Sequence, residues 1–170
     1  MTKRTRGFEV ISKYQDANIN LPVRSTYHSA GYDIEAAETI TIPSLFRQFK
    51  EGKSDRDASS CFPSTLVPTG LKAYMLEDEY LQIINRSSNP LKRNLVLPNS
   101  VGIIDQDYYN NPDNEGHIYV QLINYSMEDI VIQKGERIAQ GIFTKYYVTD
   151  TDHEASNKQQ RTGGFGSTGE

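Results

Sequence analysis

The amino-acid sequence predicts an all-β protein, built as a sandwich or a barrel of short strands. Segments rich in β-branched and aromatic residues recur along the 170 residues, and Gly, Pro and Asn separate them. No stretch sustains the 3.6-residue periodicity of an amphipathic helix. The length is that of one ordinary domain, and the single Cys61 cannot form an internal disulfide. These features together favour one domain made almost entirely of strands.

Seven segments are expected to be strands. Residues 39–42 alternate strictly between polar and apolar, which is the period of a half-buried strand. Residues 117–124 place Ile118, Val120 and Leu122 on one face and more polar side chains on the other. The other expected strands are residues 71–75, 80–84, 95–97, 129–132 and 137–148.

The remaining segments interrupt this pattern. Residues 44–50 could form about two turns of helix, and a polar insertion is expected over about residues 46–62, with its charged part at 50–60. Residues 110–115 have the composition of an extended turn. We expect a β domain over residues 1–148 and a mobile, glycine-rich tail over residues 149–170, since the tail has too few apolar residues to order itself alone.

Charge and hydropathy exclude several classes of protein. The chain has 18 basic and 22 acidic residues, a net charge of −4, so a protein that coats nucleic acid is not expected. No apolar run approaches the roughly 20 residues that span a membrane, and the basic N-terminus lacks the apolar part of a signal peptide. We therefore expect a cytoplasmic protein with no nucleic-acid or membrane partner.

Four polar segments could carry chemistry, and each also has an ordinary structural interpretation. Asp33 stands beside an expected strand, Arg86 precedes two serines, and Asp105 and Asp107 follow an apolar strand. A carboxylate can accept a proton from water, and Arg binds phosphate oxygens in pairs. A glycine-rich segment with hydroxyls, residues 163–169, can wrap phosphates. Solvated turns and an unstructured end are the alternatives. The three histidines have no metal-ligand spacing.

Taken in order, these four segments and a fifth at residues 134–140 resemble the five motifs of the homotrimeric dUTP pyrophosphatases, the dUTPases. They are AGYDI at residues 30–34, RSS at 86–88, GIIDQDYY at 102–109, KGERIAQ at 134–140 and RTGGFGSTG at 161–169. The resemblance implies a jelly-roll-like β fold, a homotrimer with active sites at subunit boundaries, and conversion of dUTP and water to dUMP and pyrophosphate. That reaction would lower dUTP and supply dUMP for thymidylate synthesis. The implied cofactor is Mg²⁺, held mainly by phosphates and waters.

The resemblance also implies roles for individual residues. Asp105 is implied to be the general base that activates water, and Asp33 to reach Mg²⁺ through water. Tyr108 is implied to pack beneath the deoxyribose and leave no room for a 2′-hydroxyl. The other implied substrate-binding residues are Arg86, Ser87, Ser88 and Gln140 for phosphates, Asn99, Gly102, Ile103, Ile104 and Tyr119 for uracil, and Arg161, Phe165, Gly166, Ser167 and Thr168 in the tail, which closes the active site.

Two departures from the pattern leave alternatives open. Ser88 stands where the family has Gly, which matters if the position needs a positive φ. The fifth motif is also one residue shorter between Arg161 and the glycines. The dCTP deaminases have a similar fold and an Arg-Ser-Ser segment, but Gln121 stands where they have a Glu. A further alternative is a phage-type dUTP-binding regulator, with residues 50–60 as the surface for a regulatory protein partner.

Overall fold

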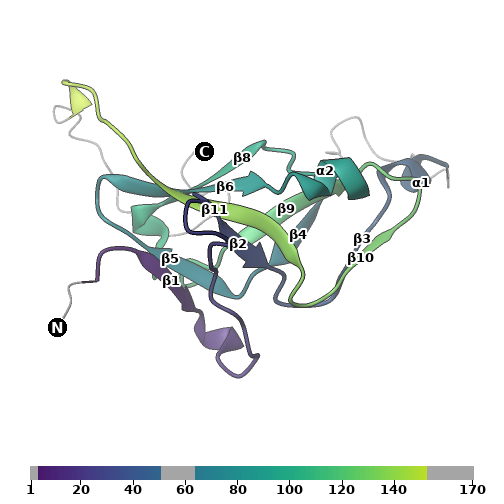
Figure 1. The fold of residues 1–170 in the computed structure, drawn as a ribbon, viewed down its shortest axis with the longest axis horizontal. Helices are drawn as coiled ribbons and strands as arrows, with labels where there is room; N and C mark the ends of the chain where they lie inside the picture. The colour runs from purple at the N-terminus through teal and green to yellow at the C-terminus, as the bar shows by residue number, and fades with distance from the viewer. Residues whose placement is uncertain (1–3, 51–63, 153–170) are drawn as a thin grey trace.

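The structure is a computed structural model that describes residues 4–50 and 64–152. The described residues form eleven strands, two α-helices and two 3-10 helices (Figure 1). The strands are β1 (Gly7–Val10), β2 (Tyr32–Glu35), β3 (Ile40–Ile42), β4 (Thr65–Pro68), β5 (Leu71–Tyr74), β6 (Glu79–Asn85), β7 (Leu95–Val96), β8 (Val101–Asp105), β9 (Tyr119–Asn124), β10 (Ile130–Ile132) and β11 (Arg137–Lys145). The helices are η1 (Ser12–Tyr14), α1 (Leu45–Lys50), α2 (Ser88–Arg93) and η2 (Gln106–Tyr108). The prediction of an all-β fold is confirmed.

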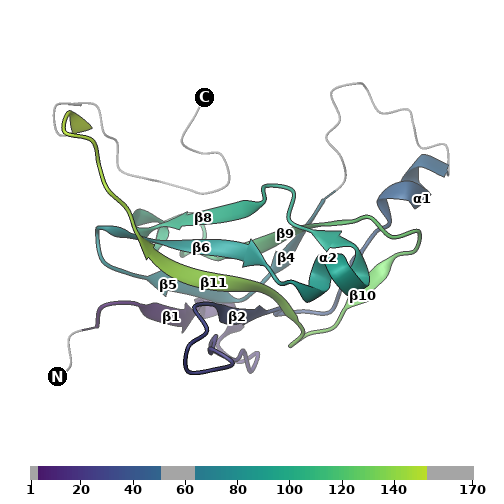
Figure 2. The same ribbon diagram turned by 45° about the horizontal axis from the view of Figure 1, so that its top comes forward.

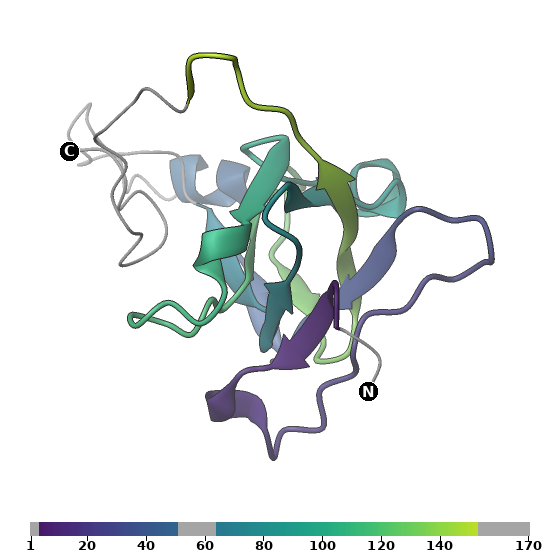
Figure 3. The same ribbon diagram turned by 90° about the vertical axis from the view of Figure 1, so that its left-hand side faces the viewer.

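All seven strand pairs of the described residues are antiparallel, and they form four sheets. The largest has the order β2-β11-β6-β8, the next is β4-β9-β7, and two ribbons pair β1 with β5 and β10 with β3. Figure 2 shows β11, β6 and β8 side by side in one layer, with β4 and β9 behind them. Figure 3 looks along the strands and shows the ladders placed around a common centre.

The core lies between the ladders and consists of the inward faces of their strands. Residues 71–74 and 79–83 alternate between buried and half-buried, as the pleat of a strand requires. The predicted inward face of β9 is confirmed, because Ile118, Val120 and Leu122 are all buried in the main apolar cluster. A second, smaller apolar cluster contains Ile11, Tyr14 and Ala37.

Several boundaries differ from the prediction for physical reasons. The expected strand 137–148 ends at Lys145, and the exposed Tyr147 and Val148 lie beyond the sheet. The weak helix expected at 44–50 is present as α1. Helix α2 was not predicted, because Asn89 and Pro90 usually disfavour helix. Here Pro90 lies in the first turn of α2, where its missing N–H costs nothing.

The described residues contain no helix that is long and apolar enough to span a membrane.

Candidate active site

Asp33 is the centre of a polar cluster assembled from four parts of the chain. Its Oδ2 accepts hydrogen bonds from Ser25 Oγ at 2.7 Å and from Arg137 Nη1 at 3.3 Å. Its Oδ1 accepts from Arg86 Nε at 3.1 Å and from Gln140 Nε2 at 3.3 Å. Arg86 and Arg137 both form ion pairs with it, so one buried carboxylate faces two guanidinium groups. The cluster is rich in donors that can also bind the oxygens of an anionic ligand.

Strand register explains why these residues meet. In the β2–β11 ladder Gln140 lies directly opposite Asp33, and in the β11–β6 ladder it lies opposite Ile84, two positions before Arg86. Gly31 permits the close approach, because a Cβ at that position would lie 3.1 Å from Gln140 Cβ. The first, second and fourth sequence motifs therefore meet at one place in one chain.

The surroundings of Asp33 keep it ionised. Burial acts to raise its pKa, but the hydrogen bond from Ser25 and the charges of Arg86 and Arg137 outweigh burial and hold the pKa below its ordinary value. An open cavity of about 440 Å³ adjoins the carboxylate, lined by Asn20, Leu21, Val23, Ser25, Asp33, Glu35 and Arg137. The cavity is formed partly by the long loop between η1 and β2, which stands away from the sheets in Figure 3.

The Asp33 cluster does not have the donor set of a direct metal site. The described residues contain no group of three or more His, Cys, Asp or Glu side chains that could hold a metal ion. The oxygens of Asp33 are already bonded to donors from both Arg86 and Arg137. This arrangement fits a Mg²⁺ ion that is held by phosphates and waters, with Asp33 reached through a water.

The two serines after Arg86 have different positions. Ser87 is exposed at the start of α2, with helical backbone angles of φ −55° and ψ −30°. Ser88 begins α2 and is absent from the residues with positive φ, so a glycine is not required there. Its Oγ accepts a hydrogen bond from Arg86 Nη1 at 3.4 Å. The buried Asn89, which the sequence analysis missed, anchors α2 by donating to Asn85 Oδ1 and to the Ile138 carbonyl.

The β8–η2 segment carries the second group of predicted residues. Asp105 is half-buried at the end of β8, in extended backbone with φ −74° and ψ 158°, directly before η2. Gly102 packs against Ile83, and a Cβ there would lie 3.7 Å from Asn99 Nδ2. The structure therefore brings Asn99 and Gly102 together at one end of β8 and places Asp105 at the other. Ile103 is exposed and Ile104 is half-buried between them.

Tyr108 and Tyr119 lie next to a buried histidine. Tyr108 is 5% exposed, and its hydroxyl donates to the carbonyl oxygen of His117 at 2.9 Å. The rings of His117 and Tyr119 are 4.0 Å apart between centroids. His117 Nε2 accepts a hydrogen bond from the backbone N–H of Gly70 at 3.0 Å. The buried contacts of His117 give it a structural role, whereas the exposed His28 lies in the loop before β2.

The burial of His117 predicts that the protein is less stable in mild acid. Burial, together with the charge of Lys13, lowers the pKa of His117 to about 4. The unfolded chain, with a histidine pKa near 6.5, therefore binds the proton first as the pH falls. The stabilising contribution is complete above pH 6.5 and decreases as the pH falls towards 4, by roughly 3 kcal/mol. Denaturant unfolding at fixed protein concentration, at pH 7.5 and pH 5, should measure about 2 kcal/mol of this loss, the part already reached at pH 5.

The matched control for that prediction is a substitution of His28. His117→Gln keeps an acceptor for the Gly70 N–H and removes the titrating ring. We expect it to abolish most of the pH dependence between 6.5 and 4.5, whereas His28→Gln leaves the dependence unchanged. An equal pH dependence in wild type and His117→Gln would contradict the assignment.

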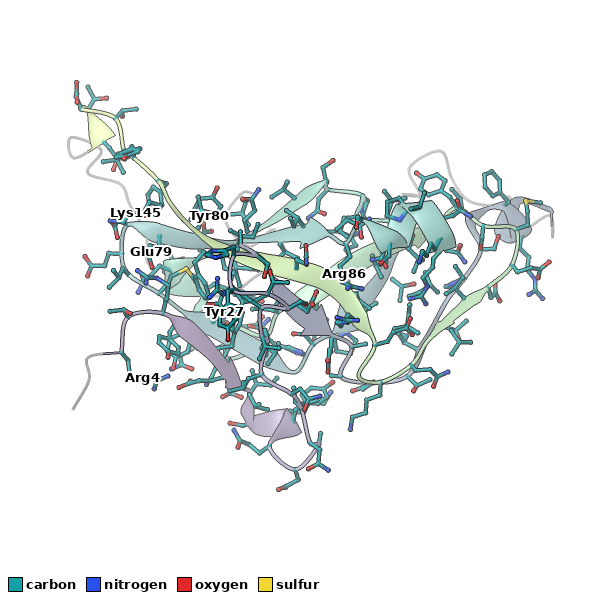
Figure 4. All side chains as sticks on the ribbon, in the orientation of Figure 1. Arg4, Tyr27, Glu79, Tyr80, Arg86 and Lys145 are labelled. Carbon is teal, nitrogen blue, oxygen red and sulfur yellow. The ribbon has the colours of Figure 1, made fainter. Side chains whose placement is uncertain are left out.

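Asp105 and Arg86 are far apart in one chain. Asp105 lies opposite Tyr80 in the β6–β8 ladder, and Arg86 follows the other end of β6. The strand rise of about 3.3 Å per residue puts their backbones roughly 20 Å apart. Figure 4 shows Tyr80 and Arg86 near opposite ends of the large ladder. One phosphate cannot contact both residues of the same chain.

The predicted tail residues Arg161, Phe165, Gly166, Ser167 and Thr168 lie outside the described residues, as does most of the expected insertion. Gln121, the residue that argued against a deaminase, lies on β9 and donates to Ser64 Oγ at 2.6 Å. Sequence reasoning did not anticipate Ser25 or Arg137 as partners of Asp33. Arg137 lies within the matched fourth motif, so its position there, together with its positive charge, could have identified it as a partner of Asp33.

Comparisons with known proteins agree with these motifs. A family model described as dUTPase matches residues 53–169. The deoxyuridine 5′-triphosphate nucleotidohydrolase of Lactococcus lactis is 55% identical over 98% of this chain and 99% of its own length. The crystal structure of a dUTPase from Streptococcus mutans is 46% identical, with a TM-score of 0.72 over 85% of this chain and 98% of that one.

A more distant structure shows only the shared fold. It is a mutant dUTPase from phage phi11 of S. aureus, described with a structural Mg(II) ion. It is 17% identical, with a TM-score of 0.64 over 86% of this chain and 94% of that chain.

Proposed function

This chain belongs to the dUTPase family and hydrolyses dUTP to dUMP and pyrophosphate, and we propose that each active site joins residues of neighbouring subunits. The separation of Asp105 from Arg86 is the observation that supports this proposal. A general base acts within hydrogen-bond reach of its water, and that water must touch the phosphorus. Because the backbones of Asp105 and Arg86 are roughly 20 Å apart in one chain, a single chain cannot bring both groups to the same phosphate.

A homotrimer with three equivalent sites satisfies this geometry. The Asp33 cluster of one subunit then faces the β8–η2 segment of a second, and residues 149–170 of a subunit close over the site. In a closed symmetric ring each subunit contributes to more than one site in the same way. The jelly-roll fold shared with the dUTPases is compatible with such a ring.

Asp105 performs the proton transfer in this scheme. Its carboxylate accepts a proton from water, and the water oxygen forms a bond to the α-phosphorus. The bond between that phosphorus and the oxygen bridging to the β-phosphate breaks, so dUMP remains and pyrophosphate leaves. Asp105 lies at the end of β8, directly before η2, so the backbone of the general base belongs to a regular element rather than to a long loop.

The Asp33 cluster binds the triphosphate. Arg86, Gln140 and the hydroxyls of Ser87 and Ser88 donate to phosphate oxygens, where charge shifts during phosphoryl transfer. Asp33 would contribute to holding a Mg²⁺ ion through water, and the ion would supply positive charge that offsets the charge of the phosphates. Arg161, Ser167 and Thr168 of the tail add contacts at the γ-phosphate, with the backbone of Gly166 beside them.

The β8 segment recognises the base and sugar. Asn99 and the backbone of Gly102, Ile103 and Ile104 pair with the uracil edge, together with the backbone at Tyr119, and Phe165 of the tail stacks on the base. Tyr108 packs beneath the deoxyribose. A wrong base leaves one of these groups unpaired, which costs about 1–3 kcal/mol and gives selectivity.

The alternative functions have less support. A deaminase needs a carboxylate where this chain has Gln121, whose amide cannot transfer protons as a carboxylate does. A regulatory role through residues 50–60 rests on a segment outside the described residues. The dUTPase scheme is supported by the arrangement of the described motifs, so it is the function we propose.

Nucleotide specificity tests the proposal directly. Pyrophosphate release is measured with Mg²⁺ and dUTP, dCTP, dTTP or UTP, and we expect strong preference for dUTP. The same samples are assayed for ammonia released from dCTP. Ammonia release, or equal hydrolysis of cytosine and uracil nucleotides, would overturn the assignment.

A further inference from the structure

The loop between η2 and β9 contacts the hydroxyl of Tyr108. Asn114 Nδ2 donates to Tyr108 Oη at 2.8 Å, while that hydroxyl donates to the carbonyl oxygen of His117 at 2.9 Å. The same loop reaches the backbone of Tyr108, since Asn111 Nδ2 donates to the Tyr108 carbonyl at 2.9 Å. The tyrosine is therefore held at both ends by residues 111–117.

Internal hydrogen bonds make this loop a fixed support. Asn111 Oδ1 accepts from the backbone N–H groups of Asp113 and Asn114, both at 3.1 Å. Asn114 Oδ1 accepts from Asn111 Nδ2 at 2.8 Å and from the Gly116 N–H at 3.0 Å. The Asn114 amide thus joins the loop to the tyrosine hydroxyl, because its oxygen binds the loop and its nitrogen binds Tyr108.

The ends of the loop are fastened to other parts of the fold. Gly116 has φ +81°, and a Cβ there would lie 2.5 Å from the Tyr108 carbonyl oxygen, so only glycine permits this approach. The Glu115 carboxylate accepts from the N–H and the Oγ of Ser12 and from Lys72 Nζ. These contacts tie the loop to the first residue of η1 and to β5. Movement of the loop as a whole is therefore restricted.

We propose that Asn114 is a positioning residue for sugar selection, acting through the hydroxyl of Tyr108. This inference rests on the proposed role of Tyr108 as the floor of the deoxyribose site. A ribose differs from a deoxyribose by one 2′-hydroxyl group. Exclusion of ribose therefore requires that the Tyr108 ring stay in place to within a fraction of the size of that hydroxyl. The two hydrogen bonds at the Tyr108 hydroxyl and its 5% exposure fix the ring against such a shift.

The expected effect of removing one of these bonds is a loss of selectivity rather than of turnover. A single hydrogen bond changes an equilibrium about three- to tenfold. We therefore expect Asn114→Ala to lower the ratio of kcat/KM for dUTP to that for UTP by about three- to tenfold. The kcat for dUTP should stay within about threefold of wild type, because Asp105 is untouched, and the KM for UTP should fall.

A double-mutant comparison separates this role from a general loss of structure. Tyr108→Phe deletes the Asn114–Tyr108 contact from the other side, together with the bond to the His117 carbonyl, and leaves the hydrogen bonds within the loop intact. Both single variants should lose selectivity, and the double variant should lose less than the sum of the two losses, since one of the removed contacts is shared. Asp113→Ala, an exposed residue of the same loop, is the matched control and should keep wild-type selectivity.

The outcomes distinguish this inference from the proposed function. If the full-length wild-type protein hydrolyses UTP as readily as dUTP, the role of Tyr108 itself fails. If wild type discriminates strongly and Asn114→Ala discriminates equally well, the positioning role alone fails. Additive losses in the double variant would also overturn it, because they would show that the two residues act independently.

Discussion

Replacing Asp105 with asparagine is expected to lower dUTP turnover by about 10²- to 10⁴-fold, the range that general base catalysis supplies. The change removes the proton acceptor but keeps the size and planarity of the side chain. Asp105 lies at the end of β8 rather than in the Asp33 cluster, so the phosphate contacts remain. The affinity for dUTP should therefore stay within about threefold of wild type.

The measurement combines single-turnover kinetics with calorimetric binding of a non-hydrolysable dUTP analogue. Asp107→Asn is the matched control, because Asp107 lies two residues further along in η2 and is more exposed. We expect this control to keep turnover within a few-fold of wild type. Near-normal turnover by Asp105→Asn, or a large loss in Asp107→Asn instead, would show that the base is misassigned.

Much of the fold could be predicted from local patterns. The inward face of β9 follows from the alternation of Ile118, Val120 and Leu122, and the loop at 110–115 follows from its Asn, Pro and Asp content. Helix α2 could not be predicted in this way. It is held by tertiary hydrogen bonds of the buried Asn89 to residues outside the helix, and such contacts leave no periodic signal.

The candidate site was predicted only in part, and the missing part is geometric. Family motifs identified Asp33, Arg86 and Gln140, but the role of Ser25 depends on how the loop before β2 folds back. Motif order also places Arg86 and Asp105 in one site without saying from which chain each comes. That information appears only in the register of β6 against β8, which puts them at opposite ends of the ladder.

A subunit-mixing experiment is expected to restore activity from two inactive variants. Asp105→Asn and Arg86→Gln should each be nearly inactive alone, the second because it removes a charged phosphate donor while keeping a hydrogen-bonding side chain beside Asp33. If a site takes Asp105 from one subunit and Arg86 from another, random 1:1 trimers should have about one quarter of their sites intact. Co-expression of the two variants in equal amounts, followed by assay of the whole unselected trimer population against wild type, measures the recovered fraction.

The control for the mixing experiment is the double variant, Asp105→Asn with Arg86→Gln, co-expressed with wild type. Sites shared between subunits again leave about one quarter intact, so the two mixtures should have equal activity. Sites contained within one chain predict a different pair of results: about one half in the control and none in the mixture of single variants. The two arrangements therefore predict different activities in both mixtures. An inactive mixture of single variants beside a half-active control would contradict the shared site. The roughly 20 Å between the backbones of Asp105 and Arg86 would then have to close by a rearrangement within one chain.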